Sequence, residues 1–154
     1  MPTARLPESD DCNCFAIRSA ARHVTQLYDQ LLAPTGLRAT QFSILAKLKH
    51  KGPLAINALA DDMVMDRTTL GRNIQPLERD GLINIHPAPS DRRAKELHLT
   101  KAGAKRLETG FEAWAKAQAR FEAGFGIKRA AELRTSLRAV VASRFAPAAK
   151  FAKR

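Results

Sequence analysis

The sequence predicts a mainly α-helical protein with one small β-hairpin, an α+β fold in which the hairpin interrupts a series of helices. Apolar residues recur at intervals of three and four residues over most of the chain, as they do on the inner faces of helices. Two short runs, 82–86 and 96–100, instead alternate apolar and polar residues, which is typical of strands. Glycine and proline separate these segments, where they stop helices and turn the chain.

The length and composition predict one folded unit per subunit. A chain of 154 residues suits one domain, or one domain with an oligomerisation extension, and 45% hydrophobic residues are enough for a core. Residues 1–11 and 146–154 are expected to be flexible tails. Because no stretch approaches the roughly 20 apolar residues of a membrane span and the N-terminus lacks an apolar signal core, we expect a cytoplasmic protein with no membrane partner.

The net charge indicates a polyanionic partner. Lysine and arginine total 26 against 15 acidic residues, which gives +11 at pH 7. The excess is spread over the chain after residue 36 and is not confined to one tail. An excess distributed over folded segments fits a nucleic-acid surface better than a membrane anchor, which needs a clustered basic run or a basic amphipathic helix.

Two helices are expected before residue 54. The first runs from Cys12 to Ala33 with an inner face that is only half apolar, and Pro34 stops it. The second occupies 39–51 and ends at Gly52-Pro53. Its inner face consists of Phe42, Leu45 and Leu48.

Residues 56–81 predict a helix, a turn and a second helix. Leu59 and Met63 share one face of the short helix, and Val64 and Met65 form the tight turn. Asp66 can cap the next helix. The inner face of that helix consists of Leu70, Ile74 and Leu77.

Pro76 lies inside the second of these helices, where it removes a hydrogen bond at a cost of ~3 kcal/mol. The apolar face nevertheless continues through Leu77 and Leu82. We therefore expect the helix to run past the proline, with a bend there, and to stop at Gly81.

The two alternating runs pair as a hairpin, with Ile83, Ile85, Leu97 and Leu99 on one side and Asn84, His86 and His98 on the other. "PAPSDRRAK", residues 87–95, is then the tip, too long for a two-residue turn. Its prolines keep the tip from extending the sheet edge. We expect Asp91 to hold one neighbouring arginine, Arg92, and to leave Arg93 free to enter a DNA groove. The alternative is a solvated polar loop.

Two further helices are expected after the hairpin, separated by "GFGI" at 124–127. The inward residues of the first should be Leu107, Phe111, Trp114, Phe121 and Phe125, and those of the last Leu133, Leu137, Val140 or Val141, and Phe145. The terminal segments 12–36 and 104–145 carry more apolar residues than the central module 37–103 can cover. This surplus predicts a homodimer built from both chain ends.

A winged helix-turn-helix with flanking dimerisation helices resembles the MarR (multiple antibiotic resistance regulator) family. "GLRATQFSIL" is similar to the family's second helix and "LADDMVMDRTTLGRNIQPLERDGLI" to its helix-turn-helix. "SDRRAKELHLTKAG" is similar to its wing, in which an aspartate precedes an arginine by two positions and the strand ends in Leu-Thr-x-x-Gly. The matching residues are Asp91, Arg93, Leu99, Thr100 and Gly103. The resemblance covers about residues 12–145.

The resemblance implies that the helix after Asp66 reads operator DNA in the major groove. Residues of its first two turns that are not on the inner face give the same set as the family pattern. Arginine can bind guanine through two hydrogen bonds, asparagine can bind adenine, and threonine can contact a phosphate or the thymine methyl. The expected DNA-binding residues are Arg67, Thr68, Thr69, Arg72, Asn73, Asp91, Arg92 and Arg93. The alternative for the helix is a solvated face.

The resemblance also implies control by a small effector, often an aromatic acid or a phenol, bound between the dimerisation helices and the DNA-binding lobe. Arg18, Arg22 and His23 on the first helix and Phe42 on the second are placed to line such a pocket. A cation facing a carboxylate beside an aromatic wall suits this ligand. For the two arginines, the alternatives are ordinary surface charge or a salt bridge in the dimer. For His23, the alternative is a packing role.

A second mode of control is implied by "CNCFAI", which is similar to the organic-hydroperoxide-sensing branch of the family. That branch has one reactive cysteine at the start of the first helix, just before a phenylalanine, and Cys14 takes this place. A helix N-terminus favours the reactive thiolate. Tyr28 matches one tyrosine of that branch, and Ala39 stands where a second is expected. The alternative is an inert, half-buried thiol.

No enzyme, metal or cofactor is expected. Gly124-x-Gly126 lacks a third glycine and a preceding strand, and the four histidines do not have metal-binding spacing. Cys12 and Cys14 could bind zinc only with two further donors. A small hydrolase or transferase with a basic cleft would need a nucleophile and base that the sequence does not offer.

The sequence is therefore interpreted as a homodimeric repressor that binds a pseudo-palindromic operator and is released by a small molecule. The first alternative is a peroxide-sensing repressor that uses Cys14. The second is a nonspecific architectural DNA-binding protein, whose affinity would be driven almost purely by salt.

Overall fold

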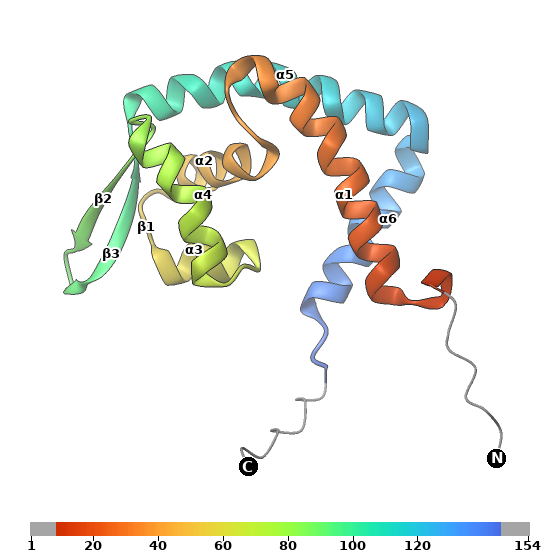
Figure 1. Cartoon of the computed structure of the whole chain (residues 1–154), viewed down its shortest axis with the longest axis horizontal. Coiled ribbons are helices and arrows are strands. Elements are labelled where there is room, and N and C mark those ends of the chain that lie inside the picture. Colours follow the sequence, from red (N-terminus) through yellow and green to blue (C-terminus); the bar gives the residue numbers. More distant parts are fainter. Residues whose placement is uncertain (1–8, 146–154) are drawn as a thin grey trace, which may run out of the picture. The chain divides into compact units, whose positions relative to one another are not determined.

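The computed structural model describes residues 9–145 (Figure 1). Most of both predicted tails, 1–8 and 146–154, lies outside the described residues. The chain divides into two compact units with the boundary after Ala117. The elements are η1 (Ser9–Asp11), α1 (Asn13–Leu32), η2 (Ala33–Thr35), α2 (Ala39–Lys51), β1 (Leu54–Ala55), α3 (Ile56–Met63), α4 (Arg67–Arg79), β2 (Ile83–Ala88), β3 (Asp91–Leu99), α5 (Lys101–Phe125) and α6 (Ile127–Ala142).

The first two helices begin and end where their sequences predict. Cys12 caps α1, and the chain leaves α1 through the 3-10 turn η2, which contains Pro34. Gly36 follows with φ 75°, a left-handed conformation that glycine adopts without a steric penalty. Asp29 of α1 then accepts a hydrogen bond from the backbone N–H of Ala39 (2.7 Å), which joins α1 to the start of α2.

The core of the first unit lies between α2, α3, α4 and the sheet. All the predicted inward residues of α2 and α4 are buried, and the α4 residues are at most 3% exposed. Burying one leucine or isoleucine side chain is worth about 1.5–3 kcal/mol, so this cluster stabilises the helix-turn-helix. Its largest fully buried members are Leu32, Ile44, Leu45, Leu48, Leu59, Leu70, Leu77, Ile83 and Leu97.

The turn between α3 and α4 depends on one residue in an unusual conformation. Val64 ends α3 with φ 53° and ψ 46°, in the left-handed region, and its side chain is 69% exposed. α4 then begins at Arg67 and continues past Pro76 to Arg79, so the predicted continuation through the proline is confirmed. Gly81 follows the helix with φ 71°, as expected of its stop.

The hairpin tip is tighter than the sequence predicts. β2 and β3 pair antiparallel up to Ala88 and Asp91, so only Pro89 and Ser90 form the turn, and the expectation of a longer tip is wrong. The register shifts between Pro87 and Ala88, which pair with Lys95 and Asp91. Because Pro87 has no N–H to continue the ladder, the extra residues of β3 are accommodated in a bulge. β1 adds to the other edge of β3, giving the order β1-β3-β2.

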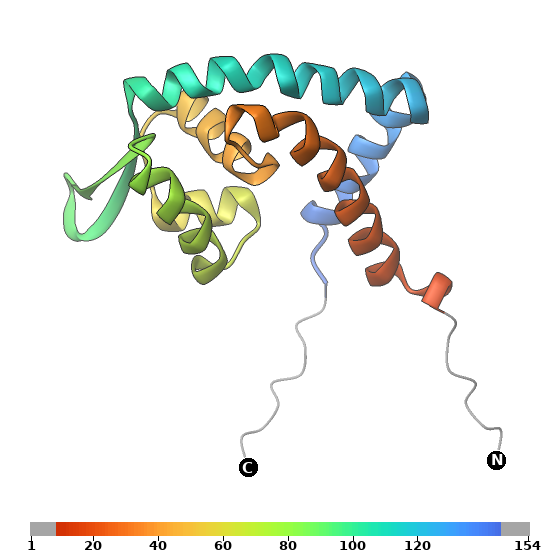
Figure 2. The ribbon, with the colours of Figure 1, turned by 45° about the horizontal axis from the view of Figure 1, so that its top comes forward.

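The part of α5 before Ala117 lies beside α2 (Figures 1 and 2). Its buried residues are Gly103, Gly110 and Ala117, spaced seven apart. Leu107 and Trp114 pack on the core as predicted, whereas Phe111 is 57% exposed and the expectation that it points inward is wrong. The reason is close approach: an added Cβ at Gly110 would lie 3.0 Å from the Phe42 ring, so small residues form the contact face.

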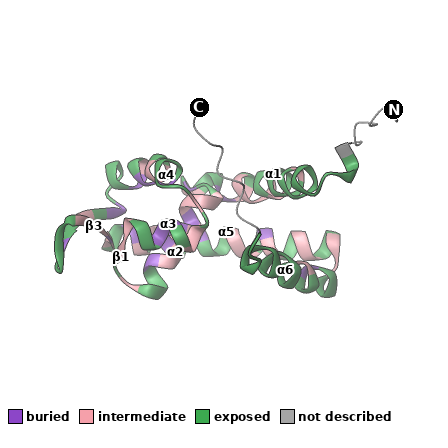
Figure 3. Cartoon of the chain, turned by 90° about the horizontal axis from the view of Figure 1, so that it is seen from below, coloured by how far each residue is buried: buried purple, intermediate pink, exposed green. Residues whose placement is uncertain are grey.

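The second unit contains the end of α5, the break at Gly126 (φ 101°) and α6. The Phe121 and Phe125 rings are 5.5 Å apart, and the Arg129 guanidinium lies 4.2 Å from the Phe125 centroid. α6 is exposed along most of its length (Figure 3), and Ala130 is its buried residue. The expectation of an inward face on α6 is therefore wrong within one chain: Leu137, Val140 and Val141 are exposed, and Phe145, also exposed, lies beyond the helix.

Candidate nucleic-acid interface and ligand hollow

The start of α4 is fixed by its capping residue. Asp66 Oδ1 accepts the backbone N–H of Thr69 at 2.8 Å, and Oδ2 accepts the Thr69 hydroxyl at 2.7 Å. These hydrogen bonds, first of all that from the Thr69 backbone, lower the pKa of the Asp66 carboxyl. The predicted cap is confirmed, and it orients the first turn of α4.

The five predicted α4 residues lie outside the core, and two of them already have intrahelical partners. The Thr69 hydroxyl is held by Asp66, and the Asn73 amide donates to the Thr69 carbonyl at 2.9 Å. In residues 9–145, no hydrogen bond or ion pair engages the side chains of the other three, which are all exposed. Among the five predicted residues, the side chains with available donors are therefore Arg67, Thr68 and Arg72.

The hairpin of β2 and β3, residues 83–99, is the wing. At its tip, the Asp91 carboxylate binds a backbone N–H and not an arginine side chain. Its Oδ1 accepts the N–H of Arg93 at 2.9 Å. In the described part of the chain Asp91 forms no ion pair with Arg92 or Arg93, so the expectation that it holds Arg92 is corrected. Both arginines are exposed. The carboxylate thus shapes the β3 backbone and leaves both side chains available.

A hollow of about 410 Å³ lies between the wing and the first turns of α3 and α4. It brings together Arg67 and Arg93, which lie on separate elements far apart in the sequence. Asn57 and Lys95 also line it, and the sequence did not single them out, although Lys95 extends the basic run of the tip. Its lining consists of Ala55, Ile56, Asn57, Arg67, Asp91, Arg93, Ala94 and Lys95. Three cations against one carboxylate make this surface suitable for a phosphate backbone.

A second hollow, of about 340 Å³, lies between α2 and α5 within the first unit. Of the predicted ligand residues, Phe42 lines it. Arg18, Arg22 and His23 are exposed on α1 and do not, so one chain does not bring the four together. Lys47, His50 and Trp114 were missed. Lys47 and His50 share a helical face with Ser43, which precedes them by four and seven positions, and not with Phe42, so the choice of Phe42 alone does not lead to them.

Three aromatic rings form one wall of this ligand hollow. The Phe42 and Trp114 centroids are 6.2 Å apart with the planes inclined by 14°, and those of Phe111 and Trp114 are 5.4 Å apart at 27°. The polar side chains of the lining are Ser43, Lys47 and His50, with no carboxylate among them. An aromatic wall beside a cation suits a small aromatic anion.

Both cysteines lie at the start of α1, exposed and with free thiols. The Sγ of Cys12 accepts the Phe15 N–H at 3.5 Å, so Cys12 is the cap, and Cys14 is the second residue of the helix. The predicted position of Cys14 is confirmed. Residues 9–145 contain no group of three or more His, Cys, Asp or Glu side chains arranged to hold a metal. None of the described helices is long and apolar enough to cross a membrane.

Comparison with known proteins agrees with this geometry. The model of the MarR family matches residues 37–95. The crystal structure of the transcriptional regulator MosR from M. tuberculosis is 33% identical, with a TM-score of 0.74 over 88% of this chain and 100% of that one. The chain belongs to the MarR family. A second MosR structure, in complex with DNA, is 34% identical at the same TM-score and coverage.

Curated relatives are matched over shorter stretches. The HTH-type transcriptional repressor NicR of Pseudomonas putida KT2440 is 28% identical over 92 residues, which are 60% of this chain and 58% of that protein. The organic hydroperoxide resistance transcriptional regulator of Bacillus subtilis 168 is 26% identical over 91 residues, 59% of this chain and 62% of that one. The match thus spans about three fifths of each relative. A mutant of E. coli MarR complexed with operator DNA, 21% identical at a TM-score of 0.73 over 81% of this chain and 90% of that one, shares the fold.

Proposed function

We propose that this MarR-family protein is a transcriptional repressor that binds operator DNA through α4 and the wing. The observation that carries the proposal is the outward face of α4, where Arg67 and Arg72 have no partner within residues 9–145 and Arg67 shares a cationic hollow with Arg93. The similarity to MosR, solved with DNA, and to the repressor NicR supports it. The proposal involves no catalysis or cofactor and assigns the protein to the cytoplasm.

The repressor acts as a homodimer on a pseudo-palindromic site. Apolar side chains are exposed at both ends of the described chain: Phe15 and Ile17 on α1, and Ile127 and Val141 on α6. A monomer rarely leaves so many large apolar side chains in water, and two-fold association buries the same faces of both copies. Two α4 helices related by a two-fold axis then read two half-sites, about one helical turn of DNA apart.

A small aromatic acid or phenol that binds in the ligand hollow between α2 and α5 releases the repressor from DNA. The stacked rings of Phe42, Trp114 and Phe111 supply the apolar contact, and Lys47 supplies the charge for a carboxylate or phenolate. Arg18, Arg22 and His23, the α1 residues predicted from the sequence, contribute only if the dimer brings them to this hollow.

Selection of bound duplexes from a random pool tests the proposed function. We expect a two-fold symmetric motif, because two copies of α4 contact two equivalent half-sites. Recovery of no preferred sequence, with an affinity that depends almost purely on salt, would contradict the proposal and favour a nonspecific architectural protein.

A peroxide-sensing repressor is the second candidate function. The free, exposed Cys14 at the start of α1 and the similarity to the organic hydroperoxide regulator of B. subtilis favour it. Here an organic hydroperoxide would release the wild type from its selected duplex, and Cys14→Ser would stay bound while Cys12→Ser responded. If neither variant nor the wild type responds to hydroperoxide, the thiols are not the switch.

A further inference from the structure

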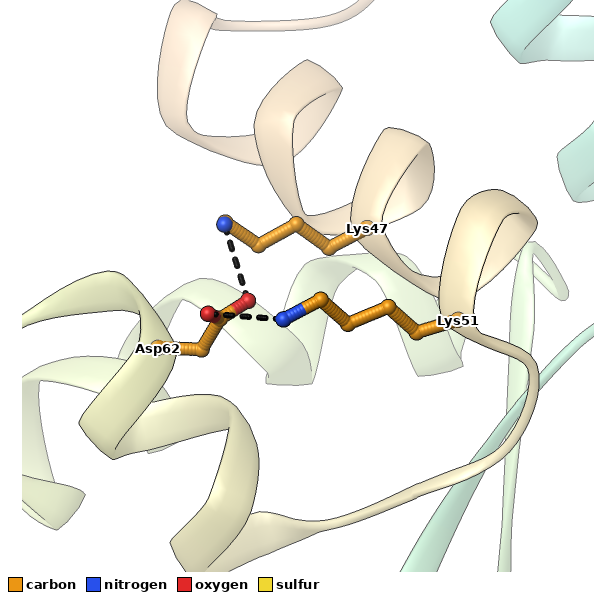
Figure 4. A network of polar contacts seen from close by, with 3 residues as sticks. All are labelled: Lys47, Lys51 and Asp62. Carbon is orange, nitrogen blue, oxygen red and sulfur yellow. Dashed lines mark hydrogen bonds and ion pairs between the residues drawn. The ribbon is translucent and has the colours of Figure 1, made fainter.

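An ion-pair network joins α2 to α3 (Figure 4). Asp62 of α3 receives two lysines of α2: Lys47 Nζ lies 2.8 Å from Oδ2 and Lys51 Nζ lies 2.9 Å from Oδ1. The two lysines, the first of them above all, lower the pKa of the Asp62 carboxyl. Asp62 is therefore ionised at neutral pH, and its carboxylate joins α3 to α2 through two ion pairs.

Lys47 belongs to two sites at once. It is a partner of Asp62, and it is also part of the lining of the ligand hollow, together with Phe42 and Trp114. Lys51 and Asp62 are not in that lining. Lysine has a long flexible stem and a point charge, so its ammonium can move between two acceptors that lie within reach of one Cα.

Resting on the proposed function, we propose that Lys47 is the switch through which a small aromatic carboxylate in the ligand hollow acts on the DNA-binding helices. The ligand's carboxylate takes the Lys47 ammonium from Asp62. One of the two ion pairs between α2 and α3 is lost as a result. Since α3 leads through Val64 and Met65 directly into α4, the recognition helix is held less firmly when the hollow is occupied.

The exchange is energetically feasible because no charge is left bare. Lys51 remains on Asp62 when Lys47 leaves, and Lys47 gains a carboxylate beside the aromatic wall. The Lys47 and Asp62 side chains are 33% and 26% exposed, but Asp62 Oδ2, the oxygen that Lys47 leaves, is itself shielded from water and accepts no hydrogen bond in the described part of the chain. Its separation from Lys47 therefore has a cost, which the contact between Lys47 and the ligand's carboxylate must offset. An uncharged aromatic ligand has nothing to offer Lys47 and leaves the network intact.

Linkage makes this switch measurable without DNA. If the ligand and Asp62 compete for the Lys47 ammonium, removing Asp62's charge must strengthen ligand binding. Trp114 is the single tryptophan of the chain and lines the hollow, so its fluorescence reports occupancy. Benzoate serves as the charged probe and benzamide as its uncharged counterpart.

The central comparison is Asp62→Asn against Asp61→Asn. Both variants remove one negative charge from neighbouring positions of α3, but Asp61 is exposed and takes part in no ion pair among the described residues. We expect Asp62→Asn to bind benzoate several-fold more tightly than the wild type and benzamide equally well. Asp61→Asn should match the wild type with both probes.

Two lysine variants should change benzoate binding in the direction opposite to Asp62→Asn. Lys47→Met should lose the preference for benzoate over benzamide. Lys51→Met should keep that preference but bind benzoate more weakly, because Asp62 then depends on Lys47 alone. Far-UV circular dichroism checks that both lysine variants are folded. If Asp62→Asn does not fold, these two variants test the proposal.

Equal benzoate affinities in Asp62→Asn and Asp61→Asn would overturn the proposal, as would a wild type that binds neither probe or does not distinguish them. A second arm uses a duplex selected by the wild type, where benzoate should weaken binding of the wild type and not of Lys47→Met. Failure to select any duplex would reject the proposed function, while the fluorescence titrations still judge the switch.

Discussion

At the scale of single residues, Arg72 gives the clearest test of whether α4 recognises DNA bases. Its side chain is exposed on α4 and has no partner among the described residues. If it binds guanine, Arg72→Ala should cost about 1–3 kcal/mol on the selected operator and relax the preference at one position per half-site. Fluorescence anisotropy on operator and random duplexes measures both effects.

Arg79→Ala is the matched control, because it removes the same charge from the last turn of the same helix. Arg79→Ala should reduce DNA affinity less than Arg72→Ala does, and by the same amount on operator and random duplexes. An Arg72→Ala variant that weakens operator and random DNA alike would make Arg72 a phosphate contact.

The Asp91 carboxylate at the wing tip has two roles that mutations can separate: its charge and its hydrogen bond. Asp91 lies among the cations that we propose to face DNA, where its negative charge would oppose binding, yet its Oδ1 accepts the Arg93 N–H and orders the tip. Asp91→Asn retains an acceptor and removes the charge, whereas Asp91→Ala removes both. We expect Asp91→Asn to bind DNA at least as tightly as the wild type and Asp91→Ala to bind more weakly than Asp91→Asn, because a loose wing must be ordered on binding.

Titrations at two salt concentrations check this order. Tighter binding by Asp91→Ala than by Asp91→Asn at both concentrations would show that the hydrogen bond does not position the wing. Arg93→Ala gives the reference: it should reduce the slope of log affinity against log salt by about one, if Arg93 neutralises one phosphate.

Val64 stores backbone strain in the turn before α4. A β-branched residue at φ 53° is disfavoured by roughly 1–2 kcal/mol, and Val64 is 69% exposed, so it gains little from burial. Asparagine tolerates this conformation. Val64→Asn should therefore raise stability by about 1 kcal/mol and the Tm by a few degrees. A lower Tm in differential scanning calorimetry would mean that the valine methyls make contacts worth more than the strain.

At the scale of elements, two glycines in helices predict opposite effects of the same substitution. An alanine Cβ at Gly71 of α4 meets nothing within 4 Å, so Gly71→Ala should stabilise the protein by about 0.5–1 kcal/mol. At Gly103 of α5 the added Cβ would collide with the Leu82 carbonyl oxygen, and backbone cannot move aside cheaply. Gly103→Ala should be strongly destabilising. Urea denaturation of both variants measures the difference, and similar midpoints would contradict the packing described for α5.

The elements also show what local sequence can predict. Helix bounds from α1 to α4 follow from capping residues, glycines and apolar spacing, which act over a few neighbours. The tip of the wing was predicted too long because its geometry depends on cross-strand register, in which Pro87 interrupts the ladder opposite Lys95. The face of α5 was misjudged at Phe111 because small residues, not large ones, allow close packing on Phe42.

The candidate sites divide in the same way. The outward residues of α4 could be predicted because one helix fixes which side chains face away from its core. The ligand hollow could be predicted only at Phe42, since its lining comes from α2 and α5, which are far apart in the sequence. Lys47 gains its second role from Asp62 on α3, a contact that no local pattern contains.

At the scale of the whole molecule, the exposed apolar side chains of α6 predict the assembly. Leu137 is 40% exposed and Val141 64% exposed, one helical turn apart on α6. If they lie in a dimer interface, Leu137→Glu with Val141→Glu places two charges in it on each copy, which costs far more than the lost apolar contact. Sedimentation at micromolar concentration should then show monomers, against dimers for the wild type.

Operator affinity should fall with the loss of the dimer, because two half-sites held by one particle benefit from a high effective concentration that separate monomers lack. Val64→Glu is the control: it adds a charge at an equally exposed valine of the first unit and should leave the dimer intact. A wild type that sediments as a monomer, or a double variant that stays dimeric and keeps its operator affinity, would contradict the role given to α6. A single half-site duplex completes the experiment, since wild type and double variant should bind it with similar affinity if α4 and the wing are unaffected.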